Sequence, residues 1–526
     1  MKALVVHELL GRTTSLFGNR EIVSGSVRLT YQSFYERVCR LASSLKRIGV
    51  KKGTVVGVLD ANTHRYLELH YALSMIGAII HTLNFRLPAD DLAYTMIHAG
   101  DEWICVSDIF LQAVKPMSDR FQNWIVMSDD ENLKLSGVSN SFSYEELVSG
   151  GDLLDSPEKI SETDIYSIFY TTGTTGRPKG IRYCHRDILL GSLQLCHHLT
   201  IHETGAHIGS ADIIMPLIPF FHIHGWGTVF FGPYMGAKMV LPGRATPAEQ
   251  VEIIRREGVT WLNMVPTQLH MLLDVESFGN VKVLTGGSAL PTGLAHQAVS
   301  RGVRYSLIYG GSDQLGASIS VVPEGKTLGS DYSEEWEMLR TRMRPLPMVD
   351  ISIRDEKGSQ LPHDGRTIGE IWVSAPWLPD GYYNDPQRSK EAYPPEHPGW
   401  FKTGDLGSMT PDGWLTVADR QKDAIKSGGE WIMSSILEAV LSEHPKVAMV
   451  AVIPVPDDRW GERPMAVVKA REPVSEEELR IFMEGKVSEG RIAKFWIPDR
   501  FLMVDEIPVT SAGKLNKEQL RKTYAN

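Results

Sequence analysis

The sequence predicts an α/β protein with a large N-terminal lobe of mainly parallel sheets covered by helices, a small β-rich subdomain, and a smaller, mobile C-terminal α/β lobe. Two observations predict this class. Strand-length apolar runs alternate with helical patterns through the first half of the chain. After residue 345 the strands become shorter and are separated by Gly, Pro and Asp turns. Because 526 residues exceed what one hydrophobic core organises, these patterns belong to separate units.

The first half of the chain contains short apolar runs, which predict strands, and longer amphipathic segments, which predict helices. The expected strands are 54–60, 78–82, 103–107, 123–127, 261–265 and 281–285. The expected helices are 65–76, 250–257 and 266–273. This β-α-β rhythm predicts parallel sheets, because a crossover helix carries the chain back before the next parallel strand.

The region after residue 345 follows a different pattern. Strands are expected at 350–354, 369–374 and 414–418, and a polar stretch without periodicity follows at 419–427. Beyond it, 434–444 and 475–487 are expected helices and 447–455 is an expected buried strand. Ser475 and Glu478 have the spacing of a capping box. We place the domain boundary near residues 420–422, which gives a large domain of residues 1–421 and a small domain of residues 422–526.

Composition and charge narrow the class of function. The 54 basic and 64 acidic side chains give a net charge of −10, which argues against general nucleic-acid binding. Four cysteines without a C-x-x-C pair do not form a disulfide framework, so a reducing cytoplasmic location is expected. The N-terminus does not read as a signal peptide, and no apolar run is long enough to predict a membrane span.

One loop carries the strongest functional signal. Residues 170–180 read YTTGTTGRPKG and follow a strand-like run. A loop rich in Gly and Thr offers backbone N–H groups, hydroxyls and a lysine to phosphate oxygens. It differs from a Walker A loop, because Lys179 is preceded by Pro and followed by Gly. The alternative is a solvent loop of biased composition, which is harder to reconcile with eleven such residues in a row.

This loop and six further motifs, in one order, closely resemble the adenylate-forming superfamily of acyl-CoA ligases, peptide-synthetase adenylation domains and firefly-type luciferases. The motifs are PFFHIHGW with Phe221 and His222, LTGGSALP with Gly286, Gly287 and Ser288, Tyr309 to Asp313 (YGGSD), Gly399 to Asp405 (GWFKTGD), Asp419 to Glu430 (DRQKDAIKSGGE), and PVTSAGKLNK with Lys514. Taken singly, each has a structural explanation; His222 alone, for example, reads as a buried core histidine.

The resemblance implies a nucleotide site and assigns its residues. The residues expected to bind ATP and AMP are Thr171, Thr172, Gly173, Thr174, Thr175, Gly176, Lys179, Gly287, Ser288, Tyr309, Gly310, Gly311, Ser312, Asp405 and Arg420. Asp405 is expected to accept hydrogen bonds from the ribose hydroxyls, with Arg420 beside it. Lys514 is the expected catalytic lysine, while His222 and Ser312 lie beside the reacting carboxylate.

The expected metal ligand is Asp313, which would bind Mg²⁺ as a hard oxygen donor. The family usually has Thr-Glu where this chain has Ser312-Asp313. Aspartate is one methylene shorter than glutamate, so its carboxylate reaches less far, and a water-mediated contact or a shared role for Gln314 is left open.

The resemblance also implies the reaction and its cofactors, which are ATP, Mg²⁺ and coenzyme A. A carboxylate acylates poorly because its leaving group is oxide. Attack on the α-phosphate of ATP gives an acyl-adenylate and pyrophosphate, and a thiol then displaces AMP. Cations and donors placed where negative charge accumulates favour the first step. No covalent enzyme intermediate is needed.

The GGEWI segment, residues 428–432, resembles the fatty acyl-CoA ligase branch for medium- and long-chain acids, as do segments 81–87 and 339–350. The expected acyl-pocket residues are Trp226, Val229, Phe230, Met264, Thr267, Gly310 and Trp431. The expected hinge and CoA-loop residues are Lys422, Gly428, Gly429 and Glu430. For Trp431 the alternative is simple packing of the hinge loop against the large lobe.

Three functions remain open at this point. The first is a ligase of medium- to long-chain fatty acids. The second is a ligase of a short-chain, thioether or aryl acid, or one that loads a separate carrier protein; CoA is the preferred acceptor because no carrier domain follows Lys514. The third is a nucleotide-binding protein without catalysis, which the presence of Lys514, Asp405 and Arg420 disfavours. A homodimer is also left open.

Overall fold

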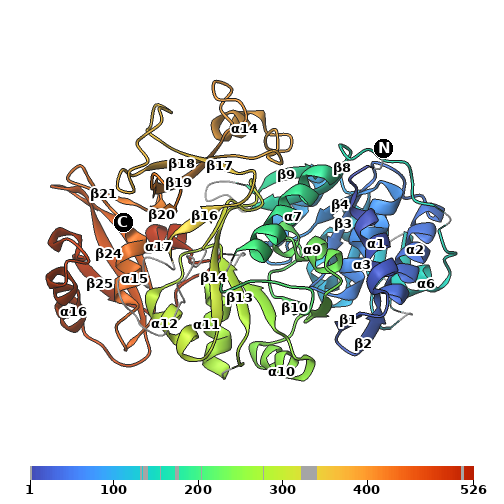
Figure 1. Ribbon diagram of the computed structural model, residues 1–526, viewed down its shortest axis with the longest axis horizontal. Coiled ribbons are helices and arrows are strands. Elements are labelled where there is room, and N and C mark those ends of the chain that lie inside the picture. The colour runs from blue at the N-terminus through green and yellow to red at the C-terminus, as the bar shows by residue number, and fades with distance from the viewer. Residues whose placement is uncertain are drawn as a thin grey trace.

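The computed structural model describes residues 3–130, 133, 140–154, 156–171, 177–202, 204–276, 278–320, 341–510 and 514–525. Figure 1 shows a broad N-terminal body, coloured blue to yellow, with a smaller C-terminal body, coloured orange to red, beside it. Three sheets organise the described chain: one of thirteen strands, one of seven and one of five.

The seven-stranded sheet has the order β7-β6-β5-β3-β4-β8-β9. Neighbouring strands are parallel except for β8 and β9, which form an antiparallel hairpin. Its strands are β3 (Val55–Leu59), β4 (Ile79–Thr82), β5 (Trp103–Ser107), β6 (Asn123–Met127), β7 (Asn140–Ser143), β8 (Ile165–Thr171) and β9 (Lys179–Cys184). The strands β3 and β5 are buried along their whole length, which is why they read as continuous apolar runs.

The thirteen-stranded sheet changes character along its length. Adjacent strands in the run β1-β11-β10-β12-β13-β14 are parallel to each other. Adjacent strands from β14 through β15, β16, β20, β19 and β18 to β17 are antiparallel. Its strands are β1 (Glu21–Ser24), β2 (Val27–Thr30), β10 (Ile213–Pro216), β11 (Lys238–Leu241), β12 (Trp261–Met264), β13 (Lys282–Gly286), β14 (Arg304–Tyr309), β15 (Ser318–Ser320), β16 (Met343–Pro345), β17 (Asp350–Arg354), β18 (Gly369–Ser374), β19 (Phe401–Met409) and β20 (Leu415–Arg420).

Helices cover these two sheets, and local signals set their ends. The main ones are α1 (Val6–Phe17), α2 (Tyr31–Arg47), α3 (His64–Ile76), α4 (Ala89–Ala99), α6 (Tyr144–Ser149), α7 (His185–Ile201), α9 (Thr228–Tyr234), α10 (Pro247–Glu257), α11 (Pro266–Val275), α12 (Thr292–Ser300) and α14 (Pro386–Ala392). In α10, Thr246 and Glu249 form a capping box, Pro247 occupies the first turn, and Gly258 ends the helix with φ +66°.

The small C-terminal lobe has its own sheet and core. Its strands are β21 (Ile425–Ser427), β22 (Glu430–Ile432), β23 (Val447–Asp457), β24 (Gly461–Ala470) and β25 (Arg500–Met503), and its helices are α15 (Ser434–Leu441), α16 (Glu476–Ser488) and α17 (Lys517–Tyr524). Ile425, Leu437 and Val452 are buried together in a separate apolar cluster. The predicted boundary at 421/422 lies in the turn between β20 of the large sheet and β21 of the small one.

The α/β class and the elements expected from periodicity are confirmed, with ends shifted by a few residues. Two details differ. The strands after residue 345 do not form a sheet of their own, because β16 joins them to the thirteen-stranded sheet. The polar stretch 419–427 includes the end of β20 and all of β21, whose backbone pairing outweighs its weak periodicity. Among the described residues, no helix combines the length and apolar character needed to cross a bilayer.

Candidate active site

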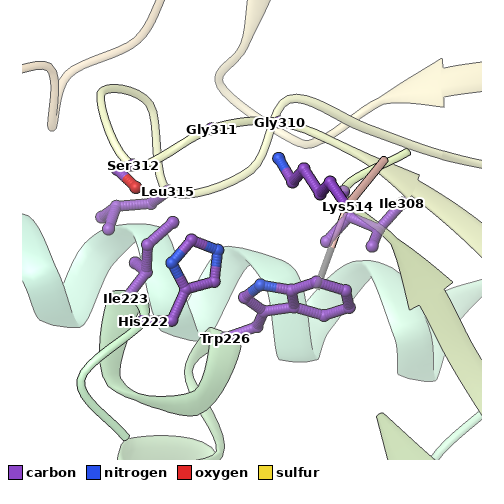
Figure 2. Close-up of a pocket in the computed structure, with 10 residues that line it drawn as sticks. His222, Ile223, Trp226, Ile308, Gly310, Gly311, Ser312, Leu315 and Lys514 are labelled. Atoms are coloured by element: carbon purple, nitrogen blue, oxygen red, sulfur yellow. The ribbon is translucent and has the colours of Figure 1, made fainter. Parts of the chain in front are cut away.

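A small cavity of about 50 Å³ lies where the two lobes meet. Four segments distant in sequence form its wall: the turn after β10, the loop after β13, the loop after β14, and the segment before α17. The lining residues are His222, Ile223, Trp226, Gly287, Ile308, Gly310, Gly311, Ser312, Leu315 and Lys514. Figure 2 shows the Lys514 side chain across the cavity from the His222 ring and the Trp226 indole.

An unusual turn places Trp226 on the cavity. Five consecutive residues, Ile223 to Gly227, have positive φ values between 41° and 79°. This left-handed conformation is unfavourable for residues with a Cβ atom, and Gly225 and Gly227 accommodate it at the least cost. Two buried contacts stabilise the turn: Asn263 donates to the Gly225 carbonyl at 2.8 Å, and His224 Nε2 lies 2.9 Å from Ser167 Oγ.

Lys514 is the small lobe's contribution to the cavity. Its backbone is held by Thr510, whose N–H donates to the Lys514 carbonyl and whose hydroxyl accepts from the Lys514 N–H. Burial, helped by the charges of Arg420 and Lys422 and opposed by Asp405, lowers the pKa of Lys514 to about 7. A cation that is partly desolvated and surrounded by positive charge is poised to receive a phosphate or a carboxylate.

His222 and Ser312 lie on the opposite side of the cavity from Lys514 (Figure 2). Burial, together with the nearby charges of Lys514 and Arg86, lowers the pKa of His222 to about 3. The ring is therefore neutral at physiological pH, so it can donate or accept a hydrogen bond without carrying charge. Ser312 is buried, and its carbonyl accepts a hydrogen bond of 3.0 Å from Tyr183.

Asp405 and Arg420 face each other across β19 and β20 as register partners. Arg420 Nε lies 3.6 Å from Asp405 Oδ1, and the Tyr309 hydroxyl donates to Oδ2 at 2.9 Å. Burial raises the pKa of Asp405, while Arg420, Tyr309 and Lys514 oppose the rise. The three predicted nucleotide residues thus meet at one place, beside Lys514.

The expected phosphate loop connects β8 to β9. Thr171 ends β8 and pairs with Lys179, which begins β9, so the loop closes an antiparallel hairpin. A Walker A loop instead precedes a helix. Thr172, Gly173, Thr174, Thr175 and Gly176 lie outside the described residues. Lys179 Nζ lies 4.5 Å from the centre of the Tyr382 ring and 3.5 Å from its hydroxyl oxygen.

Asp313 has a suitable environment for a cation. Burial raises the pKa of this carboxyl, while a hydrogen bond from Tyr382 and the charge of Lys179 lower it. Its Oδ1 atom is buried without a hydrogen-bond partner among the described residues. Within the described residues, no three or more His, Cys, Asp or Glu side chains come together in a group that could hold a metal ion by itself. One carboxylate completed by substrate phosphates is a common way for proteins to hold Mg²⁺, so these residues fit that ion.

The loop after β13, which the sequence predicts to lie on the adenine side, contributes Gly287 to the cavity. Gly287 has φ +85°, which favours glycine, and a Cβ atom there would lie 3.1 Å from Lys514 Cε. The close packing of Lys514 therefore depends on this glycine. Gly310 and Gly311 also line the cavity, whereas Ser288 is exposed outside it.

Of the residues predicted to form the acyl pocket, Trp226 and Gly310 line the cavity. Val229 and Phe230 are buried in the main core, and Met264 lies in a second apolar cluster. Thr267 is on the first turn of α11. Trp431 packs in a third cluster that contains Leu406 and Ala424. This position is compatible with the alternative that Trp431 packs the hinge loop against the large lobe. The roles of these residues toward an acyl chain stay predictions.

The predicted hinge residues occupy two turns. Lys422 lies in the turn between β20 and β21, and burial, together with Arg420, lowers its pKa to about 8. Gly428 and Gly429 form the two-residue turn between β21 and β22, with φ values of +60° and +90°. Positive φ at both central residues is the requirement of the tight hairpin turn, which explains the Gly-Gly pair. Glu430 is exposed at the start of β22.

Sequence reasoning missed several residues of the site. Tyr382 contacts both Lys179 and Asp313, and Ile308 and Leu315 supply much of the apolar wall. Ile308 could have been found as the residue before Tyr309 at the end of a buried strand. Nothing near Tyr382 in the sequence indicates its position.

Comparison with known proteins identifies the family. The model of the AMP-binding enzyme family matches residues 12–383, and that of the AMP-binding enzyme C-terminal domain matches residues 437–514. The chain belongs to this family, the adenylate-forming superfamily, near its fatty acyl-CoA ligase branch.

Similar curated proteins are CoA ligases. The chain is 35% identical to a long-chain-fatty-acid–CoA ligase of Thermus thermophilus, and the match covers 99% of this chain and 95% of that protein. It is 34% identical to a 3-methylmercaptopropionyl-CoA ligase of Ruegeria lacuscaerulensis, covering 99% and 97%. It is 30% identical to a medium-chain-fatty-acid–CoA ligase of Ectopseudomonas oleovorans, covering 99% and 96%.

A solved structure confirms the fold. The anthranilate CoA ligase AuaEII in complex with anthranoyl-AMP superposes with a TM-score of 0.86 at 21% identity, covering 99% of this chain and 97% of that one. Family membership and these full-length relatives define the chain as an AMP-forming acyl-CoA synthetase that uses ATP, Mg²⁺ and CoA.

Proposed function

We propose that this acid–CoA ligase activates a carboxylic acid with an apolar tail. The observation that carries the proposal is the composition of the cavity beside Lys514. Ile223, Trp226, Ile308 and Leu315 supply its apolar side chains, while Lys514 on one side and His222 and Ser312 on the other supply its polar groups (Figure 2). An apolar wall with a few convergent polar groups suits a carboxylate whose tail carries no polar substituent.

The proposed reaction has two steps. The acid's carboxylate attacks the α-phosphorus of ATP, the bond to the pyrophosphate oxygen breaks, and an acyl-adenylate forms. The CoA thiol then attacks the acyl carbon, its proton is lost, and AMP leaves with the bonding electrons. Lys514 stabilises negative charge in the first step, and neutral His222 and Ser312 orient the carboxylate. Asp313 would hold Mg²⁺, which would supply charge neutralisation at the phosphates.

Nucleotide binding in this proposal rests on the other side of the site. Asp405 accepts from the ribose hydroxyls with the oxygens that Tyr309 and Arg420 hold in place. Lys179 contributes positive charge to the phosphates from the β8–β9 hairpin. The meeting of Tyr309, Asp405 and Arg420 beside Lys514 supports these roles.

The tail length proposed first is the medium- to long-chain range. The long- and medium-chain relatives and the purely apolar wall favour it. A tail of that length needs Trp226 to turn aside, because core residues such as Val229 and Phe230 fill the space behind it.

A second candidate is a short-chain or thioether acid, and the size of the cavity favours it. A cavity of about 150 Å³ holds benzene. The cavity beside Lys514 is about 50 Å³, which leaves room for only a short tail while Trp226 stays in place. One relative is named for 3-methylmercaptopropionyl-CoA, a thioether product of this size class.

A panel of acids in a pyrophosphate-exchange assay separates the candidates. With butanoate, 3-methylthiopropanoate, octanoate, palmitate and benzoate, the first candidate predicts that kcat/KM rises through octanoate, by up to about 0.8 kcal/mol per added methylene. A preference for butanoate or the thioether acid over octanoate supports the second candidate. A preference for benzoate contradicts both.

Trp226→Ala tests which residue limits the tail. If Trp226 closes the end of the cavity, the variant shifts the preference toward longer acids while butanoate is used less well. Phe495→Ala is a suitable control, since Phe495 is partly exposed on the small lobe and does not line the cavity. An unchanged chain-length profile in Trp226→Ala would place the tail elsewhere.

A further inference from the structure

Helix α15 lies at the boundary between the lobes and contacts the large lobe at both ends (Figure 1). At its N-terminus, Ser434 and Ser435 contact Asp419 on β20. Just beyond its C-terminus, Ser442 contacts Gly293 on α12. Neither Asp419 nor Gly293 lines the cavity, so neither contact is explained by the site described above.

The contact at the N-terminus of α15 connects the large sheet to the segment that carries Lys514. Asp419 Oδ2 accepts hydrogen bonds from Ser434 Oγ at 2.7 Å and from the Ser435 N–H at 3.2 Å. A carboxylate is favourable at a helix N-terminus because of the unpaired N–H groups there. Ser434 Oγ also accepts from Lys517 Nζ at 2.7 Å, and Lys517 pairs with Glu438 at 2.6 Å. Lys517 begins α17, three residues after Lys514.

The contact beyond the C-terminus of α15 is a close approach of two backbones. The Gly293 N–H donates to Ser442 Oγ at 3.3 Å. A Cβ atom at Gly293 would lie 2.2 Å from the Ser442 carbonyl oxygen and 3.0 Å from its carbon. Because the opposing atoms belong to the backbone, a side-chain rotation cannot relieve this overlap. Only a separation of α12 from α15 can relieve it.

The position of Gly293 links this contact to Lys514. Helix α12 follows the loop after β13, and Gly287 in that loop packs against Lys514 Cε. The large lobe therefore meets the small lobe at Gly293 and at Gly287, six residues apart. A displacement at the first contact moves Lys514 relative to the second.

We propose that Gly293 and Asp419 are positioning residues that seat α15 so that Lys514 reaches the cavity. This inference rests on the proposed function of Lys514 in adenylation. In the second half-reaction the acyl-adenylate is already formed and Lys514 is no longer needed at the phosphate. Loosening the seat therefore slows adenylation and spares thioester formation.

The experiment compares Gly293→Ala with the matched control Gly485→Ala. Gly485 lies in α16 of the small lobe, and a Cβ atom there meets nothing within 4 Å. Gly293→Ala is expected to lower kcat of pyrophosphate exchange at least about tenfold, because a misplacement of about 1 Å can cost about 100-fold. Thioester formation from synthetic acyl-adenylate and CoA, and the unfolding temperature, stay close to wild type. Gly485→Ala leaves both half-reactions unchanged.

Trypsin provides a readout that needs no substrate. The exposed residues Arg420, at the end of β20, and Lys422, in the turn after it, connect the lobes. A loosened seat lets this segment open locally, which cleavage requires, and so speeds cleavage there in Gly293→Ala but not in Gly485→Ala. Ser442→Ala removes the hydroxyl that accepts from Gly293 and donates to the Ala439 carbonyl, and it is expected to change exchange and cleavage in the same direction by a smaller factor. If Gly293→Ala does not fold, exchange and cleavage measured in Ser442→Ala test the inference instead.

Three results would overturn the inference: wild-type exchange in Gly293→Ala, an equal loss in both half-reactions, or unchanged cleavage at the turn. Absence of exchange by the wild-type protein with every acid is a different outcome. It would contradict the proposed function, while the cleavage rates would still decide whether Gly293 seats the small lobe.

Discussion

The hydroxyl of Tyr309 donates a hydrogen bond of 2.9 Å to Oδ2 of Asp405, although the two residues are 96 positions apart in the chain. Tyr309 ends β14 in the parallel part of the large sheet, and Asp405 lies on β19 in its antiparallel part. The continuous sheet brings these two parts together. Because Arg420 lies near the other oxygen, the Asp405 carboxylate has a defined orientation before any nucleotide binds.

Tyr309→Phe should weaken ATP binding about tenfold, because a hydrogen bond to a charged group contributes about 1.5–3 kcal/mol. Titration with ATP and with 2′-deoxy-ATP measures this effect and tests the ribose role. The wild type should discriminate between them more strongly than the variant does. Tyr234→Phe, at a partly exposed tyrosine on α9, is the control. Unchanged ATP affinity in Tyr309→Phe would argue against a positioning role for this hydrogen bond.

Lys514→Ala should depress adenylation by orders of magnitude, since one preorganised electrostatic contact in an active site contributes about 3–4 kcal/mol. Thioester formation from preformed acyl-adenylate should fall far less. Pyrophosphate exchange and single-turnover thioester formation report the two steps separately. Lys522→Ala, at an exposed lysine of α17, is the matched control. Equal losses in both steps would be incompatible with the assigned role.

Adenylation should decline as the pH rises through about 7, because the lowered pKa of Lys514 means that its charge is lost there in the free enzyme. The pH profile of kcat/KM for ATP reports this ionisation. In Lys514→Arg the alkaline decline should disappear, since the guanidinium stays charged. His222, with a pKa of about 3, should add no decline above pH 5. A wild-type profile that stays flat to pH 9 would contradict the lowered pKa.

Lys422 also titrates in this range, because its pKa is lowered to about 8. Lys422→Ala therefore separates the two lysines. If Lys514 is responsible, the alkaline decline persists in Lys422→Ala.

Lys422→Pro should separate the half-reactions in another way. We propose that the domain boundary lies at 421/422 and that the small lobe rotates there between adenylation and thioester formation. The reason is that Lys514 would block the approach of CoA to the acyl carbonyl if it stayed beside that carbonyl. A hinge residue must change φ and ψ, and proline fixes φ near about −65°. The hinge-flanking amides of Asp423 and Ala424 donate to the Arg420 carbonyl.

The proline variant should therefore keep pyrophosphate exchange and lose CoA transfer. Lys422→Ala, which keeps backbone freedom, should retain both activities. If the proline variant transfers the acyl group to CoA at the wild-type rate, the pivot is elsewhere or the lobes do not rotate.

Much of the fold was predictable because its signals are local. The run Trp103–Ser107 is a buried parallel strand, and β17 and β18 have the predicted bounds. Helix α10 begins and ends at residues whose capping chemistry is visible in the sequence. The phosphate-loop, ribose and lysine motifs were also recognisable, since each is a short run of unusual composition.

The tertiary structure decided how these pieces meet. The sequence alone could not indicate that Tyr382 lies between Lys179 and Asp313, or that Trp226 rather than Phe230 or Met264 lines the cavity. Side-chain direction at Trp226 depends on a left-handed turn that distant residues stabilise.

By itself, then, the sequence determined the alternation of strands and helices, the order of the motifs and the family of the protein, because these depend on neighbouring residues. The size of the cavity, the lowered pKa of Lys514 and the close approach of Gly293 to Ser442 were decided only in the folded chain. Each depends on desolvation and on contacts between segments that are far apart in sequence, and no local pattern encodes such contacts.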